Sequence, residues 1–177
     1  MNRGRDKKPK KKRRKKADPF DPASWADRPA SAHLLQKAKF PETAPVVEQL
    51  ALGADVNAID GEGKSALHWT AVLGNTEVAE TLLAVDGVNA DIPDEYGWTP
   101  LHLAVANNHP RIIDSLLNAG AAVNATTPSN ETALDMAVAN DVQAVIDRLV
   151  EAGAMTHDKV VAAEEAAAAK SRGRRRR

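Results

Sequence analysis

Residues 97–104 read GWTPLHLA, and this stretch decides the fold because variants of it recur along the chain. GKSALH occupies 63–68 and NETALD occupies 130–135. The hydroxyl residue of the motif recurs after 34 and then 33 residues, at Ser65, Thr99 and Thr132. A fixed period of this length indicates a stack of similar units, each burying its apolar face against its neighbours.

The chemistry of the motif predicts a helix that begins at the hydroxyl residue. Thr99 is a good N-cap because its hydroxyl can accept a hydrogen bond from a first-turn amide, and Pro100 suits the first helical position. Residues that tolerate a left-handed backbone follow nine positions later, as a helix end requires, at Gly74, Asn108 and Asp141. A similar set lies two positions before each cap, as in a tight turn, at Gly63, Gly97 and Asn130. The leucines that should face the core are Leu67, Leu101 and Leu134.

A second helix is predicted in each unit by apolar residues at i, i+3 and i+4 spacing. The stripes comprise Val78, Leu82 and Leu83, then Ile112, Ile113, Leu116 and Leu117, then Val145, Ile146, Leu149 and Val150. Because a single unit cannot bury such a stripe alone, the pattern favours a solenoid over a globular core.

The motif and its period resemble the ankyrin repeat family. The resemblance implies an all-α solenoid of stacked helix-turn-helix units with β-hairpin-like finger turns. It covers residues 31–155, in which Asp135 stands where the last motif should have His. Terminal units are often atypical because one side faces water. We therefore divide the body into a degenerate N-terminal cap (31–57), two repeats (58–90 and 91–124) and a C-terminal cap (125–155).

The net charge of zero hides two basic ends. Residues 1–16 hold eleven Lys and Arg against one Asp, and residues 170–177 hold six, whereas residues 17–169 carry a net charge of −16. A block of like charge cannot bury itself, so we expect 1–16 to be a disordered basic tail. Three prolines make 17–30 a Pro-rich linker. We expect 156–177 to be a trailing helix followed by an Arg-rich tail.

Several function classes are disfavoured by composition. The chain has no cysteine, which excludes thiolate chemistry and disulfides. No apolar run reaches the length of a membrane span. His68 and His102 are one repeat apart and form no metal-ligand cluster, and no serine lies in a nucleophile motif. We expect no enzyme activity, cofactor or metal, and a monomer inside the cell: cytoplasmic in a bacterium, with the nucleus as a further compartment in a eukaryote.

The family resemblance also implies where a partner would bind. Ankyrin-like proteins use their finger tips and the exposed side of the first helices. Residues at those positions are Glu62, Lys64, Val72, Leu73, Glu95, Tyr96, Trp98, Asn107, Glu131 and Asn140. The fingers are acidic overall, which favours a protein partner with a basic surface.

The second finger stands out in the sequence. Asn89 to Thr99 spans ten residues, against eight for the corresponding stretches of the neighbouring units, so we expect a finger two residues longer. It carries Tyr96 and Trp98, and exposed aromatic residues on a protruding loop suit a binding hot spot. The alternative is that Trp98 lies across a neighbouring finger and fills a gap.

The leading hypothesis is a protein–protein interaction module that binds through its fingers and concave face. The alternative is a nucleic-acid-associated or nuclear-targeted protein tethered by its basic tails, through phosphate contacts without sequence specificity. A third interpretation has the tails screening the acidic body of their own chain. The tail residues concerned are Lys7, Lys8, Lys10, Lys11, Lys12, Arg13, Arg14, Lys15, Lys16, Arg174, Arg175, Arg176 and Arg177.

Overall fold

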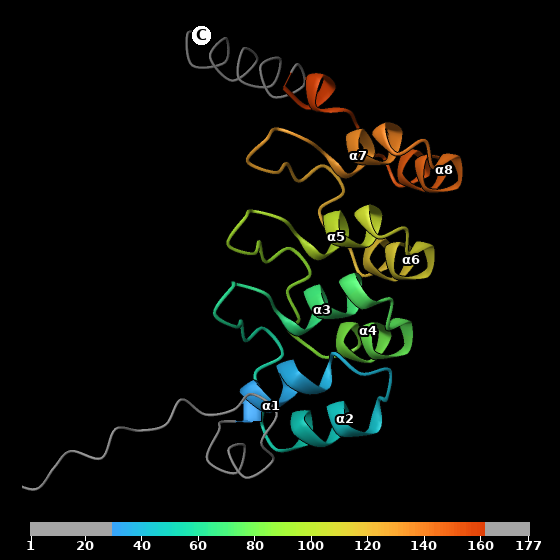
Figure 1. Ribbon diagram of the computed structural model, residues 1–177. Helices are drawn as coiled ribbons and strands as arrows, with labels where there is room; N and C mark the ends of the chain where they lie inside the picture. Colours follow the sequence, from blue (N-terminus) through green and yellow to red (C-terminus); the bar gives the residue numbers. More distant parts are fainter. Residues whose placement is uncertain (1–29, 162–177) are drawn as a thin grey trace, which may run out of the picture.

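The computed structural model describes residues 30–161, which fold into helix pairs joined by long loops (Figure 1). The helices are α1 Ala30–Lys37, α2 Ala44–Ala51, α3 Ala66–Leu73, α4 Thr76–Leu83, α5 Pro100–Ala106, α6 Pro110–Asn118, α7 Ala133–Ala139 and α8 Gln143–Glu151. Residues 157–161 are also helical, as predicted for the start of the trailing segment. The predicted basic tail, the linker up to residue 29 and the chain from 162 onward lie outside the described residues.

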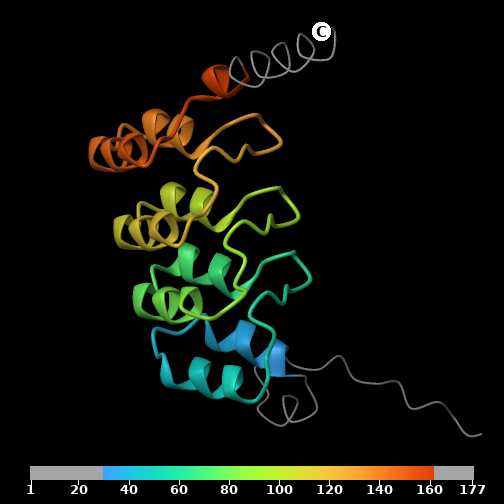
Figure 2. The same cartoon turned by 180° about the vertical axis from the view of Figure 1, so that it is seen from behind.

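The four helix pairs stack in one direction, and the loops between pairs project from the same side as fingers (Figures 1 and 2). α3 packs on α5 and α5 packs on α7, while α4 packs on α6. Within 30–161 the β-structure is limited to isolated antiparallel bridges at the finger bases, Ile59 with Ser65 and Thr126 with Thr132. The predicted all-α solenoid is confirmed.

The left-handed positions expected from the sequence are confirmed at both kinds of turn. The finger-tip residues Gly63, Gly97 and Asn130 have φ of 73°, 77° and 62°. The helix-end residues Gly74, Asn108 and Asp141 have φ of 78°, 53° and 54°. Gly97 is also needed for space, because a Cβ atom there would lie 2.6 Å from Pro128 Cδ of the next finger. The fingers therefore stack as closely as the helices do.

The core is aliphatic and follows the predicted stripes. Leu67, Leu101 and Leu134 are 2%, 1% and 6% exposed. Val150 departs from the prediction and is 55% exposed, because it lies in the last helix pair and no further pair covers it within the described chain. At the other end, Gln49 is buried at the position that a leucine occupies in the later units.

One buried histidine in each central repeat joins that repeat to the next. His68 Nδ1 accepts hydrogen bonds from Ser65 N at 3.0 Å and Ser65 Oγ at 2.8 Å, and its Nε2–H donates to Trp98 O at 3.1 Å. His102 repeats the arrangement with Thr99 and Ala125 O. The Nε2–H tautomer follows because the cap amide can only donate to Nδ1. Each imidazole thus acts as cap partner and as cross-link.

Asp135 replaces the histidine in the last unit and reverses the direction of the cross-link. Its Oδ2 accepts hydrogen bonds from Thr132 N and Oγ1, at 2.9 and 2.7 Å, and from His157 N at 2.9 Å. Burial alone would raise the pKa of Asp135, but these hydrogen bonds outweigh it and lower the pKa below the ordinary 3.8. A carboxylate needs an N–H group, and the start of the helix at 157–161 supplies one.

A second ladder of side chains joins the finger bases and corrects the predicted finger length. Asn57 Oδ1 accepts from Asn89 N, and Asn124 Oδ1 accepts from Met155 N, both at 2.7 Å. In the middle unit it is Asp91 Oδ1 that accepts from Ala122 N, at 2.7 Å. Asp91 is thus the counterpart of the two asparagines, and it lies eight residues before its cap, as they do. The prediction of a longer second finger is wrong, because the additional residue of this 34-residue unit lies between α4 and Asp91.

Asp91 makes this ladder weaker in the middle unit than elsewhere. Asn57 Nδ2 also donates to Gly87 O, and Asn124 Nδ2 to Gly153 O, but a carboxylate has no hydrogen to donate to the equivalent Gly120 O. We expect Asp91→Asn to raise the free energy of unfolding by up to about 1 kcal/mol, the net value of one hydrogen bond, in urea titrations. Asn57→Asp is the matched reverse change and should lower it. An Asp91→Asn variant that is less stable than the parent contradicts this assignment.

The two cross-linking histidines should make stability depend on pH. Burial lowers the pKa of His68 and of His102 below the ordinary 6.5, although the backbone carbonyl that each ring contacts favours the charged form. The unfolded chain therefore takes up protons first as pH falls below about 6.5. Stability is fully present above that pH and is lost below it, by at most about 1.4 kcal/mol per pH unit for each histidine.

Urea unfolding of the parent and of His68→Gln between pH 8 and 5 measures this dependence. Gln suits the same position of a capping box but does not titrate. The variant should be less stable at pH 8 and should have a shallower slope below pH 6.5. Equal slopes for the two chains would mean that His68 is not the titrating group.

Candidate functional site

A hollow of about 380 Å³ lies on the finger side of the solenoid, between the first two fingers and the inner helices behind them. Two inner helices supply its aliphatic floor, Val72 from α3 and Leu103 from α5. The fingers supply the remaining walls, which are Lys64, Asp94, Tyr96 and Trp98. The hollow is thus shared between two repeats and exists only when they stack.

Hydrogen bonds to the backbone hold the second finger in shape at this hollow. Asp94 Oδ1 accepts from Tyr96 N and from Trp98 N, both at 2.9 Å, and the Asp94 side chain is buried by these contacts. The Trp98 carbonyl is held from the other side by His68. The Trp98 indole is half-buried against the core, and its ring centroid lies 6.5 Å from that of His102. Trp98 therefore fills a gap between units, as one alternative expected, and also lines the hollow.

Tyr96 and Lys64 are the accessible groups at the rim. Tyr96 is 63% exposed. Lys64 Nζ lies 2.8 Å from Glu62 Oε2. The hydrogen bond to Glu62 raises the pKa of Lys64 against the opposing effect of burial, with Asp94 and Asp60 adding to the rise. The rim therefore combines an aromatic ring with an ion pair.

The structure gathers four of the ten predicted binding residues at this hollow: Lys64, Val72, Tyr96 and Trp98. Leu73, Glu62 and Glu95 are exposed beside it in the sequence but do not line it. The remaining three are exposed in the later units and lie apart from the lining residues: Asn107, Glu131 and Asn140. The site is therefore concentrated in the first two repeats.

Sequence reasoning missed Asp94, Leu103 and a tryptophan on the first repeat. Trp69 lies four residues after its cap, as Leu103 does after Thr99, and this shared register could have identified both. Trp69 Nε1 donates to Asp60 Oδ2 at 2.9 Å. Lys39 Nζ lies 3.8 Å from the centroid of the Trp69 ring, and Lys64 Nζ lies 5.1 Å from it.

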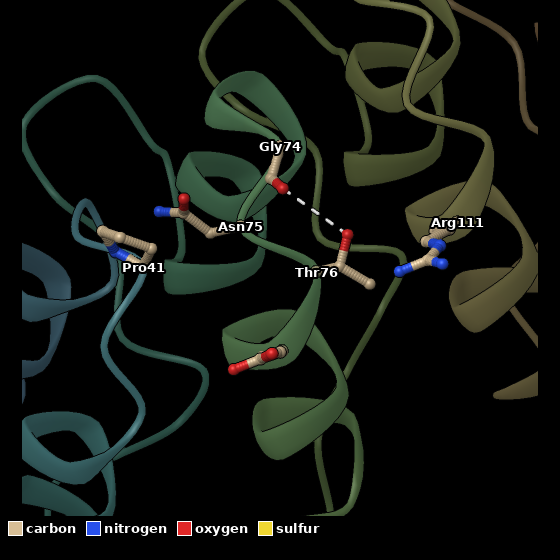
Figure 3. A pocket seen from close by; sticks show the side chains of 6 residues that line it. Pro41, Gly74, Asn75, Thr76 and Arg111 are labelled. Atoms are coloured by element: carbon tan, nitrogen blue, oxygen red, sulfur yellow. Dashed lines mark hydrogen bonds between the residues drawn. The ribbon is translucent and has the colours of Figure 1, made fainter.

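A smaller, more polar hollow of about 280 Å³ lies at the turn between α3 and α4 (Figure 3). Arg111 of α6 and the loop residue Pro41 border it together with the turn residues. Asn75 Nδ2 donates to Ala38 O at 3.1 Å, and Thr76 Oγ1 lies 3.5 Å from Gly74 O. Because hydrogen bonds within and between the units already engage these polar groups, this hollow is the weaker candidate.

Two other classes of site were considered for the same part of the chain. Among residues 30–161 there is no group of three His, Asp or Glu side chains placed to hold a metal ion. None of the helices in that range is both long enough and apolar enough to cross a membrane.

Stacked helix pairs with projecting fingers and a hollow between them define a helical repeat protein. Comparison with known proteins identifies which kind. The family described as Ankyrin repeats (3 copies) matches residues 34–127, more than half of the 177-residue chain. The chain belongs to the ankyrin repeat family. Repeats of this family generally act as protein–protein interaction modules, and the family is typically non-enzymatic.

The relatives with matching sequence are large proteins of diverse kinds. The chain is 36% identical over 97 residues to the RelA-associated inhibitor of Mus musculus, a match that covers 55% of this chain and 12% of that protein. It is 51% identical over 51 residues to neurogenic locus notch homolog protein 1 of Homo sapiens, covering 29% and 2%. It is 34% identical over 87 residues to the BTB/POZ domain and ankyrin repeat-containing protein NPR2 of Oryza sativa subsp. japonica, covering 49% and 14%. The chain thus spans only a small part of each relative.

Proposed function

We propose that the chain binds a partner protein at the hollow between its first two fingers. The observation that supports this proposal is the convergence of Val72, Leu103, Tyr96 and Trp98 around one accessible concavity. Aromatic and aliphatic side chains that surround a concave site can desolvate an inserted partner side chain, which is how hot spots contribute most of their binding energy.

The later units offer a poorer surface. The positions equivalent to Val72 are Ala106 and Ala139, and those equivalent to Leu73 are Asn107 and Asn140, all of them exposed. Small and amide side chains bury little apolar area on binding. The partner therefore docks mainly on the first two units, and the third contributes rim contacts.

The partner's chemistry follows from the lining and from the charge of the body. Residues 30–161 hold eighteen Asp and Glu against six Lys and Arg. Glu95 and Glu131 stand exposed on the second and third fingers. The segment that fits carries an apolar side chain for the hollow, with basic residues toward the second and third fingers.

Selection of peptides from a displayed random library by the immobilised full chain tests this proposal. Selection at about 0.3 M salt weakens contacts to the charged tails. Because Tyr96 is exposed and its side chain lines the hollow, Tyr96→Ala should weaken the recovered peptides at least about tenfold, as for a hot-spot residue. The melting temperature should be nearly unchanged. The measurement is fluorescence anisotropy with labelled peptides.

Two control variants separate binding from folding. Leu52→Ala removes a side chain that is 66% exposed on the first unit and outside the hollow, so it should leave the affinity unchanged. Trp98→Ala should lower both the affinity and the melting temperature, because this ring packs against the core. Peptides that bind Tyr96→Ala as tightly as the parent would place the binding surface elsewhere.

The basic ends support a second, independent candidate function, contact with nucleic acid or another polyanion. Residues 1–16 and 170–177 carry net charges of +10 and +6. Lys and Arg that neutralise phosphates release counterions, so binding by such tails weakens steeply with salt. A like-charge block of this kind also suits a nuclear import signal if the host cell has a nucleus.

Salt elution from heparin, and RNA binding by anisotropy, compare the full chain with a variant that lacks residues 1–16 and 170–177. The full chain should elute at clearly higher salt and bind RNA with a steep dependence on salt concentration. Equal retention of the two chains would rule out a polyanion-binding role for the tails.

A further inference from the structure

Lys39 lies beside the proposed site, in the segment that follows α1. Its ammonium sits 3.8 Å from the centroid of the Trp69 ring. Trp69 belongs to α3 and holds the same place in its unit as Leu103, which forms part of the floor of the hollow. The Lys39–Trp69 pair therefore lies one repeat before that floor, on the same side of the solenoid.

The carboxylates near this pair already have partners. Asp60 Oδ1 accepts hydrogen bonds from Glu62 N and Lys64 N, at 2.9 and 3.0 Å. Asp60 Oδ2 accepts the indole N–H of Trp69. Glu62 pairs with Lys64 Nζ. Within residues 30–161 no carboxylate forms a salt bridge with Lys39, and its ammonium contacts the ring alone.

A cation on an aromatic face keeps its charge and can still donate hydrogen bonds on the side away from the ring. The indole is itself fixed by Asp60, so the ammonium is held in one place before a ligand arrives. An acidic group of the partner would gain an ion pair there at little cost in ordering.

We infer that Lys39 binds a carboxylate of the partner segment whose apolar side chain occupies the hollow between the first two fingers. This inference rests on the proposed binding function. Packed helices lie about 8–10 Å apart, and an extended chain rises about 3.3 Å per residue. The acidic residue therefore lies about three residues from the apolar one, on the side of the first unit. With basic residues toward the later fingers, this arrangement fixes the direction in which the segment binds.

A double-mutant cycle on the full chain tests the inference. The probe is a library-selected peptide that binds the parent chain and loses affinity for Tyr96→Ala. One side of the cycle is Lys39→Gln, which keeps an alkyl stem over Trp69 but removes the charge. The other side changes the acidic residue of the peptide to its amide. Lys39→Arg keeps the charge and serves as the conservative control, and both variants retain the basic tails, so any contact of the peptide with the tails cancels.

Lys39→Gln should weaken the peptide about two- to fivefold, the range expected of an exposed ion pair. The amide peptide should bind parent and Lys39→Gln equally, and Lys39→Arg should bind like the parent. Independent effects of the two changes, or selected peptides without an acidic residue near the apolar one, overturn the role of Lys39 while leaving the hollow as the binding site. A library that yields no peptide sensitive to Tyr96→Ala overturns the proposed function, and with it this inference.

Discussion

A single buried side chain in each central unit, His68 or His102, contacts its own helix cap through one ring nitrogen and the next unit through the other. Both contacts need the neutral ring, because Nδ1 must accept while Nε2–H donates. The spacing of the units, the stacking of the fingers and the hollow between them all depend on this cross-link. Its geometry explains why the motif places His three residues after the cap, where a capping-box side chain can reach back.

The end of the stack follows from the same constraint. An imidazole N–H requires a carbonyl from the next unit, and an extended finger presents one at Trp98 or Ala125. Asp135 requires an N–H group instead, and it takes that of His157 where a short helix begins. The favourable dipole at a helix start adds to this contact. One substitution in the motif therefore accompanies the change from a further finger to a helix.

The fold could be predicted from the sequence because the period, the caps and the left-handed positions all lie within one repeating motif. The finger length could not, since Asn89 and Asp91 are chemically alike and only the hydrogen bond to Ala122 shows which of them holds the ladder position. The site was predicted in part. Tyr96, Trp98, Lys64 and Val72 follow from the register of the repeat, whereas Lys39 lies in the degenerate first unit, where no motif assigns its place.

Stability and binding are linked in this molecule because the same residue serves both. The Trp98 carbonyl receives the cross-link from His68, its indole packs against the core, and the same indole lines the hollow. A ligand in the hollow touches two units at once, so it stabilises their interface by mass action as it binds. Conversely, any change that loosens the cross-link alters the shape of the hollow before the helices themselves unfold, because the cavity has no existence within one unit. The selectivity of the surface for a partner therefore resides in the contact between the first and second repeats.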